Sequence, residues 1–255
     1  MGEGDAVFFQ AGMSAFGTIE GGPQTVIDVL DRVIGSEGLL AMPAFPLTGA
    51  AIEHLRRRPS FDARSDPSMM GAISERFRGL PGVTRSLHPT HSVCARGRGA
   101  EELVAGHEAA ETPFGEGTPF TALRERAAKQ VFFGSGVRAI TMYHCFEVVR
   151  EPPYPIDVFW PERIAVGCVG MDGREVEVTT LVHDPRLLPG RIDADPSLES
   201  EVRSRLLAGG MASARLGRGE VLCQALDEMF ATFESMLRDG VTIYDQRHLE
   251  EARRT

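Results

Sequence analysis

The segment from Thr141 to Glu147 carries the pair of side chains best suited to proton transfer. His144 and Glu147 are three residues apart, and on a helix this spacing places them on one face. A carboxylate beside an imidazole fixes the ring tautomer and raises its basicity, which is how a general base is commonly built. A partly buried histidine in an amphipathic helix has the same spacing, so both interpretations stay open at this point. Cys145 directly follows His144 and does not face it, which argues against a Cys–His nucleophile.

A second polar segment runs from Arg85 to Ser92 and contains a guanidinium, two imidazoles and several hydroxyls within eight residues. Such side chains are costly to bury unless they are paired or used. To hold a metal, His88 and His91 would need a third ligand, and none is near them in the sequence, so we expect no metal site. The two remaining interpretations are a structural polar turn and a ligand-binding edge that faces a phosphate or a substrate. We favour the ligand-binding edge.

Alternating apolar runs and helical periodicities predict the elements that position these segments. Residues 6–9, 39–42 and 130–133 are short apolar runs typical of buried strands, and helical patterns separate them. This alternation favours an α/β fold with parallel strands. Residues 46–67 show neither pattern, and we expect a long irregular segment there. The third run ends at Gly134, shortly before His144. Because α/β folds bind ligands at the carboxyl ends of their strands, we expect the His144 segment at such an edge.

The C-terminal part predicts a smaller addition to this sheet. Residues 163–182 have the pattern of a β-hairpin, and residues 197–207 and 220–238 have helical periodicity. A proline-rich stretch precedes the hairpin. We therefore expect a single domain over residues 1–255, with a seam near 151–162.

Composition excludes several classes of protein. The 255 residues include 27 basic and 36 acidic side chains, a net charge of −9 that argues against a nucleic-acid partner. No apolar stretch approaches the roughly 18 residues of a membrane helix. The four cysteines are scattered and form no Cys-x-x-Cys pair, which agrees with a reducing, cytoplasmic location. The serine-hydrolase, Walker and Rossmann glycine motifs are absent from the sequence.

Several motifs in a fixed order resemble the aminoglycoside 3-N-acetyltransferase family, also called the antibiotic N-acetyltransferase family. The matching stretches are residues 21–27, 37–45, 61–62, 67–71, 81–93, 106–108 and 113–120. The resemblance covers residues 5–185 well and the remaining third loosely. It implies a three-layer αβα sandwich with a central mixed sheet and an added C-terminal hairpin and helical part. It also implies an acyl-CoA donor, here acetyl-CoA, and no metal.

The resemblance implies His144 as the general base, supported by Glu147 and by Asp184, which follows the predicted hairpin. The family usually opens with a His-Ser-Ser turn that packs on the CoA, whereas this chain has Gln-Ala-Gly-Met-Ser at residues 10–14. Backbone amides of this turn are still expected to meet the donor. The residues expected to bind acetyl-CoA are Gly12, Met13, Ser14, Arg85, Ser86, Thr90, Ser92 and Gly134.

The expected reaction is direct transfer of an acetyl group to an amino group of an aminoglycoside, a related amino sugar or a small amine. His91, Asp62 and Glu116 are expected to contact this acceptor, the carboxylates because it is cationic. The expected role is antibiotic resistance or antibiotic biosynthesis, and a homodimer is left open. Two alternatives remain: a non-catalytic small-molecule binder on the same fold, and an acyltransferase that uses a carrier-protein or longer acyl donor in biosynthesis.

Overall fold

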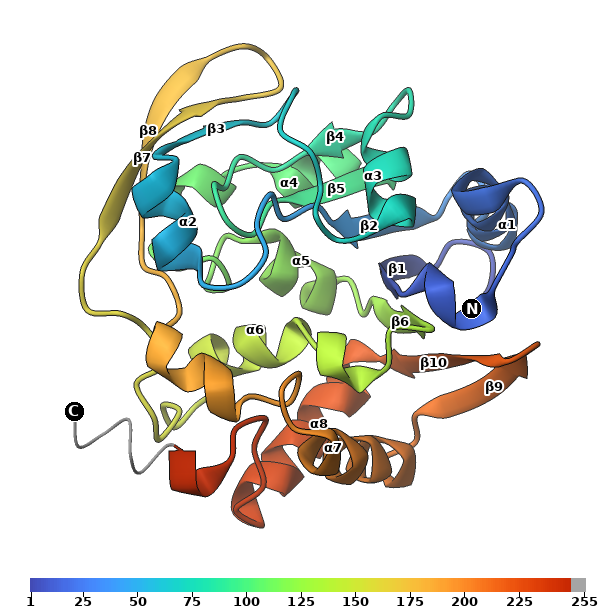
Figure 1. Cartoon of the computed structure of the whole chain (residues 1–255). Coiled ribbons are helices and arrows are strands. Elements are labelled where there is room, and N and C mark those ends of the chain that lie inside the picture. The colour runs from blue at the N-terminus through green and yellow to red at the C-terminus, as the bar shows by residue number, and fades with distance from the viewer. Residues whose placement is uncertain (249–255) are drawn as a thin grey trace.

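A computed structural model describes residues 1–248, and within them one mixed sheet of seven strands forms the centre of the molecule (Figure 1). Its order is β4 (Thr84–Arg85), β5 (Val93–Gly97), β2 (Leu39–Pro43), β1 (Ala6–Ala11), β6 (Lys129–Phe133), β10 (Gly219–Ala225) and β9 (Ala212–Leu216). The middle strands β2, β1 and β6 are parallel, and the outer strands are antiparallel to their neighbours.

Alternate side chains of the middle strands enter two separate apolar cores. In β1, Phe8 packs into the core on one face of the sheet, whereas Val7 and Phe9 pack into the core on the other face. In β6, Phe132 likewise points opposite to Val131. Strands buried on both faces need helices on both sides, and this explains why their sequences are continuous apolar runs.

The helices complete the outer layers. One face is covered by α1 (Gly22–Ile34) and α3 (Ala72–Arg78). The other is covered by α4 (Ala100–Val104), α5 (Pro119–Glu125), α6 (Met142–Val149), α7 (Pro196–Ala208) and α8 (Leu226–Arg238). Short 3₁₀ turns lie between them, at η1 (Met13–Phe16), η2 (His107–Ala109), η3 (Val137–Ala139) and η4 (Pro185–Gly190). The predicted three-layer αβα fold with a central mixed sheet is confirmed.

A second, three-stranded sheet lies beside the main one in the described part of the chain. It consists of β3 (Ser60–Asp62), β7 (Ile164–Val169) and β8 (Glu175–Thr180), and it packs with α2 (Ala51–Arg57) around a third apolar core. The strands β7 and β8 are the predicted hairpin (Figure 1).

Two sequence-based expectations about elements are wrong. Residues 46–67 contain α2 and β3, although their sequence suggests an irregular segment, because Ile52 and Phe61 are buried against the hairpin. Residues 219–225 form β10 instead of the start of a helix, since Leu222 alternates with its neighbours between the two faces of the sheet. Residues 151–162 connect α6 to β7, and the single-domain organisation stays a prediction. None of the helices within residues 1–248 is long and apolar enough to cross a membrane.

Candidate active site

The carboxyl ends of β1 and β6 meet at two glycines. The backbone N–H of Gly12 donates to the carbonyl oxygen of Phe133 over 2.8 Å. A Cβ atom added at Gly12 would lie 2.7 Å from the Gly134 oxygen, and one at Gly134 would lie 2.5 Å from the ring of Phe16. Gly134 also has a φ of +68°, which only glycine adopts without strain. The two loops can therefore approach each other only because both positions lack a side chain.

The loop after Gly134 leads into α6, which carries the predicted dyad. His144 Nδ1 lies 2.7 Å from Glu147 Oε2, and the Glu147 side chain has no exposed surface. Burial by itself would raise the pKa of the Glu147 carboxyl. The charge and hydrogen bond of His144, together with those of His183, instead lower this pKa to about 2. The spacing in the sequence therefore corresponds to a buried, ionised carboxylate in contact with an imidazole.

His183 is a third member of this group that the sequence did not lead us to predict. It lies between β8 and η4, with Nε2 3.5 Å from Glu147 Oε2. Its ring centroid lies 4.2 Å from that of His144. The only sequence signal was its position beside Asp184, the residue that we expected to support the dyad.

Asp184 itself does not contact the dyad. Its carboxylate accepts hydrogen bonds from the backbone N–H and the guanidinium of Arg186, and it caps the N-terminus of η4. The expected support for His144 from Asp184 is therefore not seen, because a local partner two residues away occupies both carboxylate oxygens.

A cavity of about 220 Å³ opens in front of His144. Its wall combines the sheet edge, the loop after β2, the turn between η3 and α6, and the segment after η4. The side chains that line it are Gln10, Phe45, Leu47, Thr48, Met70, His91, Arg138, Ala139, Ile140, Thr141, His144, Arg191 and Ile192, together with Gly49. The cavity therefore brings together the predicted base, the predicted substrate residue His91 and Gln10 at the end of β1.

Gln10 stands at the end of β1 and contributes an unpaired acceptor to this wall. Its Nε2 donates to Thr141 Oγ1 over 3.0 Å. Its Oε1 is buried and has no hydrogen-bond partner among residues 1–248. An unpaired carbonyl oxygen is costly to bury.

Most of the polar segment 85–92 is used within the protein. His88 and His107 stack with ring centroids 4.5 Å apart. His88 Nε2 contacts Thr180 Oγ1, and its Nδ1 accepts from backbone N–H groups of the turn. Thr90 is fully buried and its hydroxyl lies 2.8 Å from His91 Nδ1. This part of the segment is a structural turn that orients His91 toward the cavity.

The serines of the segment are also internal. The Ser86 hydroxyl lies 2.9 Å from His107 Nδ1 and accepts from the backbone N–H of Val93. The Ser92 hydroxyl donates to the carbonyl of Ala44. Neither hydroxyl is exposed to solvent, so the predicted contact of Ser86 and Ser92 with CoA has no support in this arrangement.

Arg85 is buried in the core instead of facing a phosphate. Its guanidinium donates to the carbonyl oxygens of Ala44, Ala63 and Asp66 and lies 4.8 Å from the centroid of the Phe61 ring. Each of its nitrogens has an internal acceptor, the third being Ser92 Oγ. We correct the expected CoA contact of Arg85 to a structural role that holds the loop around residues 63–66.

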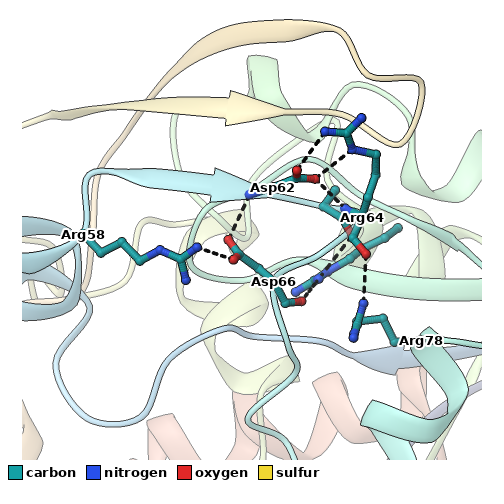
Figure 2. A network of polar contacts seen from close by, with 7 residues as sticks. Arg58, Asp62, Arg64, Asp66 and Arg78 are labelled. Atoms are coloured by element: carbon teal, nitrogen blue, oxygen red, sulfur yellow. Dashed lines mark hydrogen bonds and ion pairs between the residues drawn. The ribbon is translucent and has the colours of Figure 1, made fainter.

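Asp62 belongs to the polar network on top of this loop. Its carboxylate accepts from the Arg64 guanidinium, while Asp66 accepts from Arg58 and from the backbone N–H of Asp62 (Figure 2). The Arg78 guanidinium donates to the Arg64 carbonyl (Figure 2). Asp62 does not line the cavity, so its predicted substrate contact has no geometric support.

The other predicted residues lie apart from His144 to different degrees. Met13 and Ser14 form η1 directly after the Gly12 turn and do not line the cavity. Glu116 lines a different pocket, formed with residues of α5, α6 and α8. The expected contact of Glu116 with the acceptor bound at His144 is therefore not supported.

One group of potential metal ligands occurs within residues 1–248, formed by His144, Glu147 and His183, whose ligand atoms lie within 4.8 Å of one another. The 2.7 Å separation of His144 Nδ1 and Glu147 Oε2 is that of a hydrogen bond, in which a proton lies between the two atoms. This donor set is suited to moving a proton.

The family model described as aminoglycoside 3-N-acetyltransferase matches residues 8–238. The chain belongs to this family. The family membership expected from the motifs is thereby confirmed.

Two curated members of the aminoglycoside 3-N-acetyltransferase family illustrate the relationship. Aminoglycoside N(3)-acetyltransferase VII of Streptomyces paromomycinus is 32% identical over 167 residues, which are 60% of this chain and 57% of that protein. Aminoglycoside N(3)-acetyltransferase VIII of Streptomyces fradiae is 28% identical over 262 residues, covering 97% of this chain and 88% of that protein. The chain thus spans little more than half the length of the first relative and most of the second.

Solved structures share the fold of this family member. AAC-IIIb, solved as a binary complex with CoASH, superimposes with a TM-score of 0.77 at 23% identity and covers 96% of this chain and 93% of its own. AAC-VIa bound to sisomicin gives a TM-score of 0.73 at 25% identity, with 94% and 93% covered. The αβα arrangement is therefore common to all three proteins.

Proposed function

We propose that this chain is an N-acetyltransferase that moves an acetyl group from acetyl-CoA directly to an amino group, with His144 as the general base. The observation that carries the proposal is the 2.7 Å contact of His144 Nδ1 with the buried Glu147 Oε2 at the wall of the cavity. Family membership supports the reaction class and the donor. The thioester of acetyl-CoA supplies an activated acyl carbon.

The dyad solves the problem that a protonated amine has no lone pair for attack. His144 donates its Nδ1–H to Glu147, which leaves Nε2 as the proton acceptor. The imidazolium formed when Nε2 takes the amine proton is stabilised by the ionised carboxylate behind it. The attacking nitrogen loses a second proton to solvent when the amide forms. His144 returns the first proton to the thiolate that departs as the C–S bond breaks, so that the base is restored after each turnover.

Gln10 and the glycine turn are the residues that we propose for the donor. The unpaired Gln10 Oε1 would accept an amide N–H of the pantetheine arm. The backbone of Gly12, Met13, Ser14 and Gly134 surrounds the same sheet edge. Arg85, Ser86 and Ser92 are left out of this site because their polar atoms have internal partners.

The acceptor is proposed to be an aminoglycoside or a related amine that reaches His144 past His91. A less cationic amine is the second candidate, and the composition of the cavity wall favours it. Within residues 1–248 no Asp or Glu lines the cavity, whereas the guanidinium groups of Arg138 and Arg191 do. A polycationic acceptor is best stabilised by carboxylates, so its binding would depend on groups outside this wall.

Transfer is tested by incubating the protein with acetyl-CoA and a panel of amines, and by measuring release of the free CoA thiol. The panel contains aminoglycosides with a 3-amino group, neutral amino sugars and amino acids. We expect His144→Gln to lower kcat/KM by about 10²–10⁴-fold, because a positioned base contributes that much. His54→Gln on α2, which is not in the cavity wall, is the matched control and should stay at the wild-type rate. A His144→Gln protein with more than about a tenth of the wild-type rate would remove His144 from this role.

The same proposal includes the organisation of the protein. We propose a single acyltransferase domain acting in the cytoplasm. The described cysteines are free thiols, which agrees with a reducing compartment. Light scattering of the purified protein would show whether it forms a homodimer.

A further inference from the structure

We infer that His183 is a positioning residue for the dyad: it donates its Nε2–H to Glu147, fixes the carboxylate, and sets the pH range in which His144 works as a base. This inference rests on the proposed function. It concerns a residue that shares the Glu147 oxygen with the base and does not line the cavity.

A single oxygen connects the two imidazoles. Glu147 Oε2 lies 2.7 Å from His144 Nδ1 and 3.5 Å from His183 Nε2. A carboxylate oxygen has lone pairs for two donors, so both rings can donate to it at once. The Glu147 side chain has no solvent contact, and water therefore cannot replace a lost donor. Each hydrogen bond to this oxygen is therefore stronger than the same bond would be at the protein surface.

The ring of His183 is held by two phenylalanine rings. Its ring centroid lies 5.0 Å from that of Phe159 and 5.5 Å from that of Phe114. Its backbone pairs with Phe159 in an isolated antiparallel bridge. The side chain is 12% exposed, so the ring has little freedom to turn away from Glu147. This packing gives His183 the fixed geometry that a positioning residue needs.

His183 stays neutral while His144 changes its charge. Burial, the nearby His144 and Arg191 lower the pKa of His183 to about 4, although Glu147 opposes this shift. A neutral imidazole carries one N–H, and the proximity of Glu147 Oε2 places it on Nε2. His183 therefore acts as a fixed neutral donor over the working pH range.

Other groups face this cluster from the surrounding elements. His91 lies in the turn before β5, with its ring centroid 6.4 Å from that of His183. Arg191 follows η4. Burial, and after it the charge of Glu147, raise the pKa of the Tyr244 hydroxyl well above its ordinary value. Burial and the neighbouring histidines lower the pKa of His91 well below its ordinary value. Neither His91 nor Tyr244 is thus expected to change charge between pH 6 and 9.

The direction of the expected pH shift follows because His144 and His183 share one oxygen of Glu147. His183 uses part of the accepting capacity of Glu147 and so weakens the stabilisation of the His144 imidazolium. When the second donor is removed, the carboxylate interacts with His144 alone, and the imidazolium becomes easier to form. The acidic limb of the pH dependence of kcat/KM is then expected to move to a higher pH. A purely structural role of His183 would lower the rate equally at all pH values.

The experiment compares His183→Phe and His183→Gln with wild type in kcat/KM between pH 5.5 and 9. His183→Phe keeps a ring but no donor, and we expect its acidic limb to move up by at least about half a pH unit. We also expect its plateau to fall about three- to tenfold, since the carboxylate is less well fixed. His183→Gln retains an N–H donor and should return the limb toward the wild-type position. His54→Gln serves as the control for replacing a histidine elsewhere.

A second readout separates this inference from the proposed function. NMR titration of the His144 imidazole measures its pKa in wild type, His183→Phe and His183→Gln without requiring turnover. A raised His144 pKa in the Phe variant supports the inference even if no amine is acetylated, in which case the proposed function alone fails. An unchanged His144 pKa, or a uniform loss of rate with no movement of the limb, overturns it. If the Phe variant does not fold, the Gln variant carries the test. An acidic limb of His183→Gln that moves up by about half a pH unit or more would overturn the inference, because this variant retains the N–H donor.

Discussion

His144 and Glu147 form a hydrogen-bonded pair one helical turn apart on α6, with Nδ1 and Oε2 separated by 2.7 Å. The carboxylate is completely buried, whereas the imidazole lies in the cavity wall. This arrangement depends on the end of β6, where the turn at Gly134 sends the chain across the sheet edge and into the helix. The proposed base thus has a buried side that contacts Glu147 and an outer side that faces the cavity.

Replacing Glu147 by Gln tests the contribution of its charge. The amide preserves the shape but cannot stabilise an imidazolium, and it can present an N–H to His144 Nδ1. We expect kcat to fall about 10²–10³-fold while KM for acetyl-CoA changes little. Glu234→Gln on α8, where the native carboxylate pairs with Arg150 near the surface, is the control. A Glu147→Gln protein that keeps a third of the wild-type kcat would show that the carboxylate is dispensable.

Gln10 provides a test of the donor site. Removing its side chain eliminates the unpaired Oε1 and with it one hydrogen bond to the bound donor. A hydrogen bond of about 1 kcal/mol corresponds to about a fivefold weaker affinity. We therefore expect Gln10→Ala to raise the Kd for acetyl-CoA about fivefold in a calorimetric titration. The exposed Gln24→Ala on α1 should leave the Kd unchanged. Equal affinity of Gln10→Ala and wild type would place the donor amides elsewhere.

Arg85 should matter for stability and not for donor binding. Replacement by Met leaves the carbonyl oxygens of Ala44, Ala63 and Asp66 without their donor inside the core. Buried acceptors that lose a charged partner cost about 3 kcal/mol in the free energy of unfolding. Chemical denaturation of Arg85→Met and of the half-exposed Arg58→Met measures the difference, and only the first is expected to lose this much. An Arg85→Met protein with unchanged stability and a tenfold lower affinity for CoA would instead support the CoA contact that the sequence predicts for Arg85.

The contrast between His144 and Arg85 explains how far the sequence was informative. The dyad depends on residues three positions apart on one helix, so its geometry follows from helical spacing alone. The partners of Arg85 come from residues 44, 63 and 66, which only the tertiary fold brings together. A polar segment has the same sequence whether its groups meet a ligand or one another. Of residues 85–92, only His91 lines the cavity, so the ligand-binding interpretation stays a prediction for His91 alone.

His183 was missed for a related reason. It lies 36 residues after Glu147, and its contact depends on the return of the chain from the second sheet. The carboxylate beside it in the sequence, Asp184, looked better suited to support a base but is occupied by Arg186. The strands and layers were easier to predict because their apolar runs record burial directly. Short elements such as α2 and β3 contain too few residues for a helical or strand periodicity to be recognised in the sequence.

Buried histidines predict a loss of stability in mild acid. Burial lowers the pKa of His107 to about 4, although its contact with the Pro113 carbonyl opposes the shift. In the unfolded chain an imidazole titrates near 6.5. Below that pH the unfolded state binds a proton that the folded state does not, so the free energy of unfolding falls as the pH drops from about 6.5 toward 4. Above pH 6.5 His107 is neutral in both the folded and the unfolded state, so it no longer makes the free energy of unfolding depend on pH.

His107→Gln isolates this contribution, because an amide can donate to the Pro113 carbonyl and accept from Ser86 but does not titrate in this range. Between pH 6.5 and 5 each such histidine accounts for about 2 kcal/mol, from about 1.4 kcal/mol per pH unit. Urea unfolding at both pH values should therefore show a drop that is about 2 kcal/mol smaller in the variant. Glu147 does not interfere, since its lowered pKa stabilises the fold above about pH 4.5 and is lost only toward pH 2. Equal drops in both proteins would mean that His107 takes up its proton without unfolding.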